Sequence, residues 1–348
     1  MRKYRYGCIG AGGIALNKHL KGYSNLDNVE ICAISDISME ALNKIKKIYP
    51  EIKTYTNHLE MIEKENLDLL SVCTPNKFHK EYTIDALKAG INVHCEKPIA
   101  MNEQEAIEMV EASKKYNRKL MLGLNNRFTN QACFVRDFIK DGGLGNIYYV
   151  RCGWRRRRLI PKIGGWFTNK EFSGGGPLID LGVHFIDLTM HFMNYPNPTS
   201  VSASTFRKFS NSKCKNLNIP KDIGEYSYNI EDLATGFVRL DNGASISFEF
   251  SFAMNNEKEE YFYELFGDVG GVSFKNGELK IYTEYNNTIV DIIPDTNYPQ
   301  KEINEFQHFI DVIENKVECL SKPEDGIKMM QIIDATYKSA QLKKEVIF

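Results

Sequence analysis

The first third of the chain alternates short apolar segments with segments that carry apolar residues at helical spacing. Strands are expected at residues 4–9, 29–35, 68–73, 92–95 and 119–123, and helices at 14–23, 38–48, 77–89 and 103–116. Strands that are apolar on both faces and separated by helices are typical of a parallel sheet with helices on both sides. This order of elements predicts a doubly wound α/β domain.

The pattern changes after residue 124, where strand-like segments follow one another closely. Strands are expected at 147–157, 201–207, 233–240, 244–252 and 261–266, and helices at 131–140, 302–314 and 323–342. Asp241-Asn242-Gly243 separates two of these strands and is typical of a hairpin turn. We therefore expect two domains, residues 1–124 and 125–348, the second with an antiparallel or mixed sheet. The pattern leaves open which domain the last two helices pack on.

Composition and charge exclude several classes of partner. Hydrophobic residues make up 43% of the 348 residues and charged residues 26%, as in soluble globular proteins. The net charge of −1, with both signs mixed along the chain, argues against binding of nucleic acid or an anionic membrane. No segment is apolar for long enough to span a bilayer, and no secretory signal is recognisable. The eight cysteines form no C-x-x-C pair and are interpreted as buried thiols of a cytoplasmic protein.

A glycine-rich turn follows the first expected strand and fits the pattern G-x-G-x-x-A. Gly10 allows the tight turn from strand to helix, and Gly12 has no side chain that would keep a pyrophosphate from the backbone. Ala15 lets the helix pack close to the strand, and the helix N-terminus offers N–H groups to phosphates. The residues between these positions, Gly13 and Ile14, belong to the same expected cofactor loop. The turn predicts binding of a nicotinamide dinucleotide.

An acidic residue, Asp36, ends the second expected strand. A carboxylate there suits a ribose 2′-hydroxyl and repels a 2′-phosphate. Ile37 and Ser38 follow, so neither adjacent position supplies a cation for that phosphate. NAD is therefore favoured as the cofactor, with NADP as the alternative.

Two segments carry candidate catalytic residues. Lys97 lies in Glu96-Lys97-Pro98 at the end of the strand 92–95, where ligands of doubly wound sheets bind, and its ammonium can stabilise charge on a substrate oxygen. Asp180 and His184 are four residues apart in an expected helix and share a face, so the carboxylate can orient the imidazole as a general base. The alternatives for this pair are a structural core histidine and, with Asp187, a metal site.

At these residues the chain resembles the Gfo/Idh/MocA family of oxidoreductases, which includes glucose–fructose oxidoreductase and inositol dehydrogenase. The resemblance extends over most of the chain. Its motifs are Gly10-Ala11-Gly12-Gly13-Ile14-Ala15, Thr74-Pro75-Asn76 with His79, Glu96-Lys97-Pro98, Asn125-Asn126-Arg127-Phe128 and Asp180-Leu181-Gly182-Val183-His184. The chain departs from the family at Asn126, where many relatives have arginine.

The resemblance implies an α/β N-terminal Rossmann domain and an α+β C-terminal domain with a large open, mostly antiparallel sheet. That sheet would join subunits in a homodimer or homotetramer. Lys97, Asp180 and His184 match the family's catalytic positions. Thr74, Pro75, Asn76, His79, Glu96, Lys97 and Asn125 match positions that line the cofactor. Substrate contacts are expected from Lys97, Arg127, Trp166, Asp180 and His184, with no metal.

These residues suggest hydride transfer between nicotinamide and a secondary alcohol of a sugar, cyclitol or related polyol. His184 would remove the hydroxyl proton, Lys97 would hold the oxygen, and Asp180 would orient His184. The same residues also suit an enzyme that oxidises a glycoside transiently, eliminates the aglycone and reduces the product. A dinucleotide-sensing protein without turnover is a third interpretation. The presence of a candidate general base, His184, beside Asp180 argues against it.

A run of four arginines, 155–158, ends one expected strand. Recognition of an acidic or phosphorylated sugar is one interpretation. Neighbouring residues of a strand point to opposite faces, so four consecutive arginines cannot all reach one ligand. The run is therefore interpreted as a polar sheet face or a subunit contact.

Overall fold

The computed structural model describes residues 2–161, 163–209, 228–295 and 303–348. The chain divides into two compact units, Met1–Asn125 with Ile303–Ile327, and Asn126–Glu302 with Lys328–Phe348. A single boundary after residue 124 therefore leaves out the segment Ile303–Ile327, which belongs to the first unit although it follows the second in sequence. The physical reason is a set of buried contacts: Glu305 pairs with Lys18, and Phe306 packs on Tyr23.

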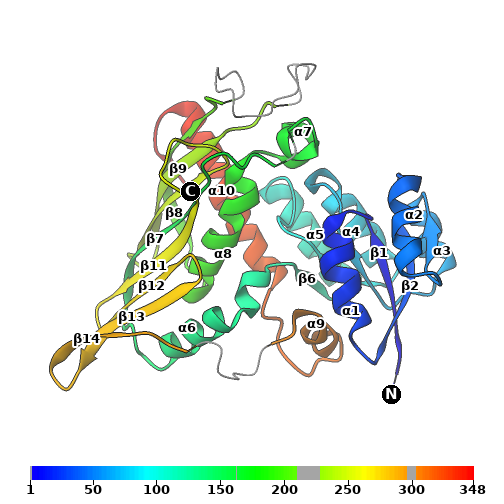
Figure 1. Ribbon diagram of the computed structural model, residues 1–348, viewed down its shortest axis with the longest axis horizontal. Coiled ribbons are helices and arrows are strands. Elements are labelled where there is room, and N and C mark those ends of the chain that lie inside the picture. The colour runs from blue at the N-terminus through cyan, green and yellow to red at the C-terminus, as the bar shows by residue number, and fades with distance from the viewer. Residues whose placement is uncertain (1, 162, 210–227, 296–302) are drawn as a thin grey trace. The chain divides into compact units, whose positions relative to one another are not determined.

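The first unit contains a parallel sheet, and Figure 1 labels its strands β1, β2 and β6. The described strands have the order β3-β2-β1-β4-β5-β6. The strands are β1 (Tyr4–Ile9), β2 (Val29–Ser35), β3 (Lys53–Tyr55), β4 (Leu69–Val72), β5 (Asn92–Cys95) and β6 (Leu120–Leu122). The order reverses between β1 and β4, and in such sheets ligands bind at the carboxyl ends of the strands near this reversal. The predicted doubly wound domain is confirmed.

Helices connect these strands. They are η1 (Ala15–Leu20), which continues as α1 (Lys21–Ser24), then α2 (Met39–Ile48), α3 (His58–Lys64), η2 (Asn76–Phe78), α4 (His79–Lys88) and α5 (Glu103–Lys115). Side chains cap several of them: Ser38 accepts the N–H of Ala41 at the start of α2, and Asn102 accepts that of Glu105 at the start of α5. Helix α9 (Glu305–Ile313) contacts α1.

The second unit contains a mixed sheet, with the order β14-β13-β12-β11-β7-β10-β9-β8-β15 among the described residues. The strands are β7 (Ile147–Arg155), β8 (Pro198–Phe206), β9 (Leu233–Leu240), β10 (Ser245–Ser251), β11 (Glu260–Gly267), β12 (Gly271–Lys275), β13 (Glu278–Tyr285), β14 (Thr288–Ile292) and β15 (Val346–Ile347). The pair β10–β7 is parallel and the other described pairs are antiparallel. The expected mostly antiparallel sheet is confirmed.

Helices of the second unit cover one face of this sheet. The helical segments that lie wholly in this unit are α6 (Asn130–Lys140), η4 (Trp166–Thr168), α7 (Lys170–Ser173), η5 (Leu178–Gly182) and α8 (Val183–Phe192). Segments η3 (Asn125–Phe128) and α10 (Pro323–Leu342) begin in the first unit and end in the second. Segments η5 and α8 form one continuous helix, because Gly182 and Val183 both have right-handed helical backbone angles. Helix α8 contacts β7 and β11, and η5 contacts β10, so this helix lies against the middle of the sheet.

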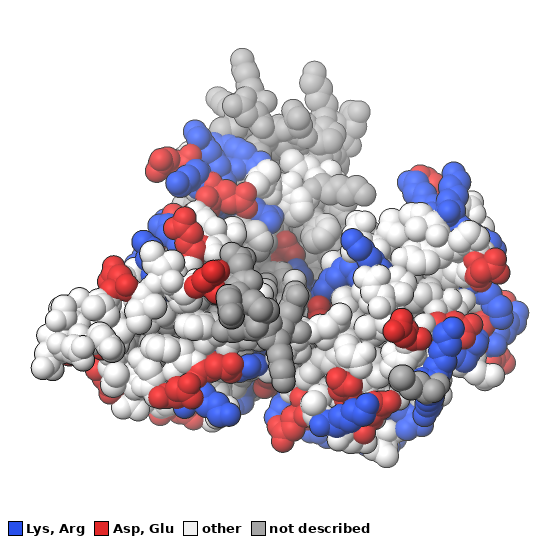
Figure 2. All heavy atoms as spheres, turned by 60° about the horizontal axis from the view of Figure 1, so that its bottom comes forward, with Lys and Arg blue, Asp and Glu red and all other residues white. Residues whose placement is uncertain are grey.

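The surface carries both signs of charge. Figure 2 shows basic and acidic side chains interspersed over the face that it draws, in keeping with the net charge of −1. Among the described residues, no helix is both long enough and apolar enough to cross a bilayer.

Candidate active site

The loop after β1 has the geometry that a dinucleotide requires. Gly10 has φ +98°, and a Cβ there would lie 2.4 Å from the carbonyl oxygen of Cys73, so only glycine fits. A Cβ at Gly12 would meet nothing within 4 Å, which leaves this part of the backbone open to a ligand. The helix that follows directs its first N–H groups toward the same loop. The loop therefore fits a pyrophosphate.

Asp36 lies directly after β2 and reaches the glycine loop. Its Oδ2 accepts the N–H of Ala11 at 2.7 Å, and its Oδ1 accepts the N–H of Ser38 at 2.8 Å. Each carboxylate oxygen has two lone pairs, so each can also accept a hydrogen bond from a hydroxyl group. The position at the carboxyl end of β2 fits a ribose diol, as the sequence predicts.

The segment after β4 is fixed by a buried histidine. The ring of His79 is 1% exposed, with Nδ1 2.7 Å from the Pro98 carbonyl oxygen and Nε2 3.0 Å from the Thr74 carbonyl oxygen. Burial lowers the pKa of His79, against the opposite effect of the two carbonyls. His79 thus joins the segments that carry Thr74 and Lys97, and its burial favours a supporting position over direct cofactor contact. The neighbouring Pro75 is partly exposed and Asn76 is buried.

The carboxyl end of β5 carries Glu96 and Lys97. Glu96 is 6% exposed, and its carboxylate accepts hydrogen bonds from Lys18 at 3.1 Å and from His19 at 2.8 Å. Lys97 is partly exposed, and Asn125, after β6, is exposed. The carboxyl ends of β1, β2, β4, β5 and β6 lie along one edge of the parallel sheet, so these predicted cofactor residues share that edge.

In the second unit, Asp180 belongs to η5 and His184 to the first turn of α8. Of the residues 175–190, Asp180 and His184 are the ones that keep partial exposure, and the others are buried. Segment η5 has π-helical hydrogen bonding, a feature frequent at functional sites. Two polar residues that share the accessible part of a buried helix fit the predicted pair of orienting carboxylate and general base.

The glycines before this helix serve packing. A Cβ at Gly175 would lie 1.9 Å from the Tyr337 hydroxyl, and one at Gly176 would lie 2.2 Å from the Glu231 carbonyl oxygen. The Glu231 carboxylate accepts the N–H groups of Gly176 at 2.9 Å and Leu178 at 3.3 Å, which caps the start of the helix. Burial raises the pKa of Glu231. These contacts fix the helix that carries Asp180 and His184.

A group of side chains beside His184 was not anticipated from the sequence. The centroid of the Trp154 ring lies 6.4 Å from that of His184 and 5.5 Å from that of Tyr261. Trp154 donates its indole N–H to Glu259 at 2.8 Å, and the Arg156 guanidinium lies 4.6 Å from a Trp154 ring centroid. Trp154 is one of two tryptophans in the chain, which is the sequence signal that could have singled it out.

Two predicted substrate residues have other partners. Arg127 is 1% exposed and binds Asp187 through Nε and Nη2, at 2.9 and 2.5 Å, while Nη2 also donates to the Tyr195 hydroxyl at 2.7 Å. A buried guanidinium in such a pair supports the fold, and this burial argues against the expected substrate contact. Trp166 is partly exposed, and its ring stacks on that of Phe167 with centroids 3.8 Å apart.

The arginine run 155–158 also has protein partners. Arg155 pairs with Glu249 and Glu260, and Arg156 pairs with Glu259. Arg157 donates to the Glu257 carbonyl, and Arg158 donates to the Met254 carbonyl. Carboxylates thus neutralise Arg155 and Arg156, and backbone carbonyls occupy donors of Arg157 and Arg158. These contacts favour the interpretation as a polar sheet face over an anion site.

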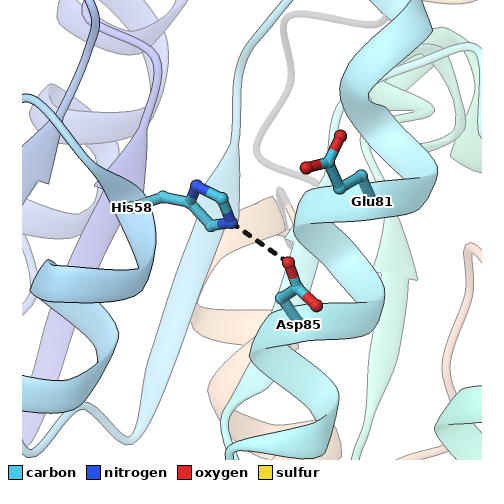
Figure 3. Close-up of side chains that lie close together, drawn as sticks. All are labelled: His58, Glu81 and Asp85. Atoms are coloured by element: carbon cyan, nitrogen blue, oxygen red, sulfur yellow. Dashed lines mark hydrogen bonds and ion pairs between the residues drawn. The ribbon is translucent and has the colours of Figure 1, made fainter.

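His58, Glu81 and Asp85 bring three potential metal-ligand atoms within 4.8 Å of one another (Figure 3). The side chain of His58, from α3, points toward Asp85 on α4, with Nε2 3.1 Å from Oδ2. Glu81 is exposed, and the His58 ring packs on Tyr82 with centroids 4.3 Å apart. A hydrogen bond between the two helices accounts for the contact of His58 with Asp85, so the group carries no metal assignment.

A surface cavity of about 660 Å³ in the first unit is lined by residues such as Lys114, Arg118 and Lys322. Arg118 and Lys119 immediately precede β6, so the cavity lies at the amino-terminal edge of the parallel sheet. The glycine loop lies at the opposite, carboxyl-terminal edge. This cavity is therefore separate from the candidate active site.

The sheet order, the glycine loop and the acid after β2 define a dinucleotide-binding protein with a second, α+β domain. Comparison with known families agrees: a model described as "Oxidoreductase family, NAD-binding Rossmann fold" matches residues 4–124. A second, "Oxidoreductase family, C-terminal alpha/beta domain", matches residues 136–347. The chain belongs to the Gfo/Idh/MocA family of oxidoreductases, and its N-terminal domain is an NAD-binding domain.

Relatives of similar length support this assignment. The chain is 31% identical to the D-glucoside 3-dehydrogenase of Escherichia coli strain K12, covering 97% of this chain and 95% of the relative. It is 25% identical to the inositol 2-dehydrogenase of Rhizobium meliloti strain 1021, over 98% of both chains. The solved structure of a levoglucosan dehydrogenase with NADH and levoglucosan shares the fold, with a TM-score of 0.85 and 20% identity over 99% of both chains.

Proposed function

We propose that this protein is an NAD-dependent dehydrogenase that transfers hydride between nicotinamide and a secondary hydroxyl of a glycoside, sugar or cyclitol. The observation that carries the proposal is the pair Asp180–His184, the partly exposed polar positions of an otherwise buried helix stretch in a member of an oxidoreductase family. A glycoside is the preferred substrate class, because the full-length relative at 31% identity is named for a D-glucoside.

Bound NAD would supply the hydride acceptor, and the chain's own residues would supply binding and proton transfer. Asp36 and the glycine loop would hold the ribose and the pyrophosphate. His184 would take the proton of the substrate hydroxyl, and Asp180 would keep its imidazole oriented and basic. Lys97 would donate a hydrogen bond to the reacting oxygen and stabilise the negative charge that develops on it.

A substrate panel tests this proposal. Methyl glucosides, glucose, myo-inositol and levoglucosan are incubated with the enzyme and NAD or NADP, and reduced cofactor is read by absorbance and products by mass. We expect reduced cofactor to accumulate with NAD and at least one of these compounds. Release of aglycone without accumulation of NADH would instead identify the transient-oxidation reaction.

Variants assign the roles. His184→Ala and Lys97→Ala are each expected to lower kcat about 10²-fold to 10⁴-fold, as for loss of a general base or an oxyanion donor. Glu257→Gln is the control substitution. Arg157 donates its hydrogen bond to the backbone carbonyl of Glu257, so the change of side chain leaves this contact in place. Full turnover in either active-site variant would remove that residue from the mechanism.

We also propose that the open sheet joins subunits. Strands β13 and β14 expose large apolar side chains, among them Tyr282 at 42%, Ile289 at 82% and Ile292 at 42% exposure. Light scattering after size exclusion is expected to give a dimer or tetramer, and Ile289→Lys is expected to shift the protein toward the monomer. A monomeric wild-type protein would contradict this part of the proposal.

A further inference from the structure

Two successive residues of the helix after the glycine loop contact the Glu-Lys-Pro segment. Lys18 and His19, both in η1, reach the same carboxylate oxygen: Lys18 Nζ lies 3.1 Å and His19 Nε2 2.8 Å from Oε1 of Glu96. His19 is fully buried, and its other ring nitrogen, Nδ1, lies 2.8 Å from the Ser71 hydroxyl oxygen. The helix whose N-terminus fits the pyrophosphate thus also holds the residue before Lys97.

The second oxygen of Glu96 faces the catalytic candidate directly. Oε2 accepts the backbone N–H of Lys97 at 3.2 Å. The carboxylate also lies against Gly123, where an added Cβ would be 3.1 Å from Oε1 and 3.2 Å from Oε2. Glu96 is therefore held by two donors on one oxygen, by packing against Gly123, and by the peptide N–H of Lys97 on the other oxygen.

The protonation states of this cluster follow from burial and from its charges. Burial lowers the pKa of His19 to about 4, so its imidazole is neutral at pH 7. A neutral ring that donates a hydrogen bond from Nε2 to Glu96 accepts one from the Ser71 hydroxyl at Nδ1. Burial acts to raise the pKa of Glu96, but Lys18 and His19 outweigh it and hold that pKa well below its usual range. Glu96 is thus a carboxylate that accepts from each donor around it.

The outer side of the cluster belongs to another element. Lys18 Nζ also lies 3.2 Å from Oε1 of Glu305, the first residue of α9, and His94 Nε2 lies 3.2 Å from the same oxygen. The partners of Glu305 in this cluster are Lys18 and His94. The cluster therefore has an inner part, around Glu96, and an outer part that fastens α9 through Lys18.

We propose that Lys18 and His19 are positioning residues for Lys97. They clamp Glu96, and Glu96 fixes the peptide N–H of Lys97, so the backbone from which the Lys97 ammonium extends is tied to the cofactor-binding helix. This inference rests on the proposed role of Lys97 in hydride transfer. Loss of the inner clamp would misplace the ammonium and slow turnover, whereas loss of the outer contact would loosen α9 alone.

Paired substitutions of His19 test the clamp. The amide nitrogen of glutamine is as many bonds from Cα as His Nε2, so His19→Gln can keep the donor to Glu96, whereas the shorter His19→Asn reaches only the position of Nδ1. Both variants lose the ring and its packing. We expect His19→Asn to lower kcat about 10-fold with KM for NAD within about twofold, and His19→Gln to stay within about twofold of the wild-type kcat.

A second readout does not depend on turnover. Exchange of the Lys97 backbone amide with D₂O, measured by mass spectrometry with fragmentation to single residues, should be about 10-fold faster in His19→Asn and Lys18→Met. It should be unchanged in His19→Gln and in Glu305→Gln, which is the matched control for the outer contact. Glu305→Gln should lower Tm while leaving kcat unchanged.

The outcomes separate the clamp from the proposed function. Equal amide exchange at Lys97 and equal kcat in the two His19 variants would overturn the clamp. Faster exchange in His19→Asn in a protein whose Lys97→Ala variant keeps full turnover would uphold the clamp as a structural device and reject Lys97 as a catalytic residue. Should Lys18→Met fail to fold because two buried carboxylates lose their cation, the His19 pair still decides the question.

Discussion

Asp180 and His184 lie four residues apart in one continuous helix and are the positions between residues 175 and 190 that retain exposure. Asp187, one turn further along, is 1% exposed and binds the guanidinium of Arg127. One helix thus carries a partly exposed acid, Asp180, near the candidate base, and a buried acid, Asp187, that pairs with an arginine of the core. This difference gives a matched pair of substitutions.

Asp180→Asn should lower kcat and leave stability almost unchanged. The amide keeps the shape of the side chain but removes the charge that would orient His184 and raise its basicity, so a loss of about 10²-fold to 10⁴-fold is expected. Asp187→Asn should do the reverse, with unfolding free energy lowered by about 3–5 kcal/mol because a buried arginine loses its charged partner. Thermal unfolding and steady-state kinetics on both variants check this. Equal kcat losses in the two would contradict the division of roles.

Asp36 should determine the preference for NAD. The carboxylate lies beside the glycine loop, 2.7 Å from the N–H of Ala11, and Ile37 next to it is 89% exposed. Asp36→Ser combined with Ile37→Arg removes the negative charge and supplies a cation for a 2′-phosphate. We expect the ratio of kcat/KM for NAD to that for NADP to fall about 10²-fold. Ile37→Arg alone is the control, and a double variant that still prefers NAD as strongly as the wild type would argue against this role.

Trp154 is expected to bind the substrate. Its ring lies beside His184, and its indole N–H is held by Glu259, so its orientation is fixed. An indole face is well suited to the C–H groups of a sugar ring. Trp154→Leu should raise the KM for the sugar about 10-fold, with a smaller effect on kcat and none on the KM for NAD. Trp166→Leu provides the comparison, because Trp166 is the tryptophan expected from the sequence. A larger effect at Trp166 would reverse the assignment.

Stability should decrease as the pH falls below 6.5. Burial lowers the pKa of His19 and His191 from 6.5 to about 4. Between pH 6.5 and 4 these two residues are therefore protonated in the unfolded chain and neutral in the folded chain, which favours unfolding as the pH falls. Burial acts to raise the pKa of Glu305, but Lys18 outweighs it and the result is about 2, which adds a further loss between pH 4.5 and 2.

Calorimetry checks this pH dependence. The Tm of the wild type should fall steadily from pH 7 to pH 4.5, and His19→Gln should show a shallower fall, because one buried neutral histidine is removed. A shift of one pKa unit corresponds to about 1.4 kcal/mol, so the histidine contribution is large enough to resolve. Identical pH profiles for the two proteins would show that His19 does not contribute.

The sequence was sufficient for the fold class because its main signals are local. The strands and helices of the first unit have clear apolar periods, and Gly10, Gly12 and Asp36 have fixed places relative to them. Strands β13 and β14 were not predicted because half or more of their side chains are exposed, so their apolar alternation is weak. Strand β12 has only five residues and begins with a glycine, which leaves little alternation to recognise. The short β3 and α3 offered too few residues to show a period.

The contacts that were missed join residues far apart in sequence. Lys18 and Glu305 are 287 positions apart, and nothing near either residue predicts their pairing or the return of Ile303–Ile327 to the first unit. Arg127 illustrates the converse: the family motif predicts a substrate contact, whereas a partner 60 positions away, Asp187, buries its guanidinium. The roles of Lys97, Asp180 and His184 remain predictions.

The most direct test of the central claim follows the transferred hydrogen. The glycoside or cyclitol that the substrate panel identifies is prepared with deuterium on the carbon to be oxidised. After the reaction, the reduced cofactor is isolated and its mass is measured by mass spectrometry. Hydride transfer predicts NADH one mass unit heavier than the unlabelled product, with a slower rate than for the undeuterated substrate when chemistry limits turnover. NADH without deuterium, or an enzyme that binds NAD and reduces none of it with any member of the panel, would contradict the account.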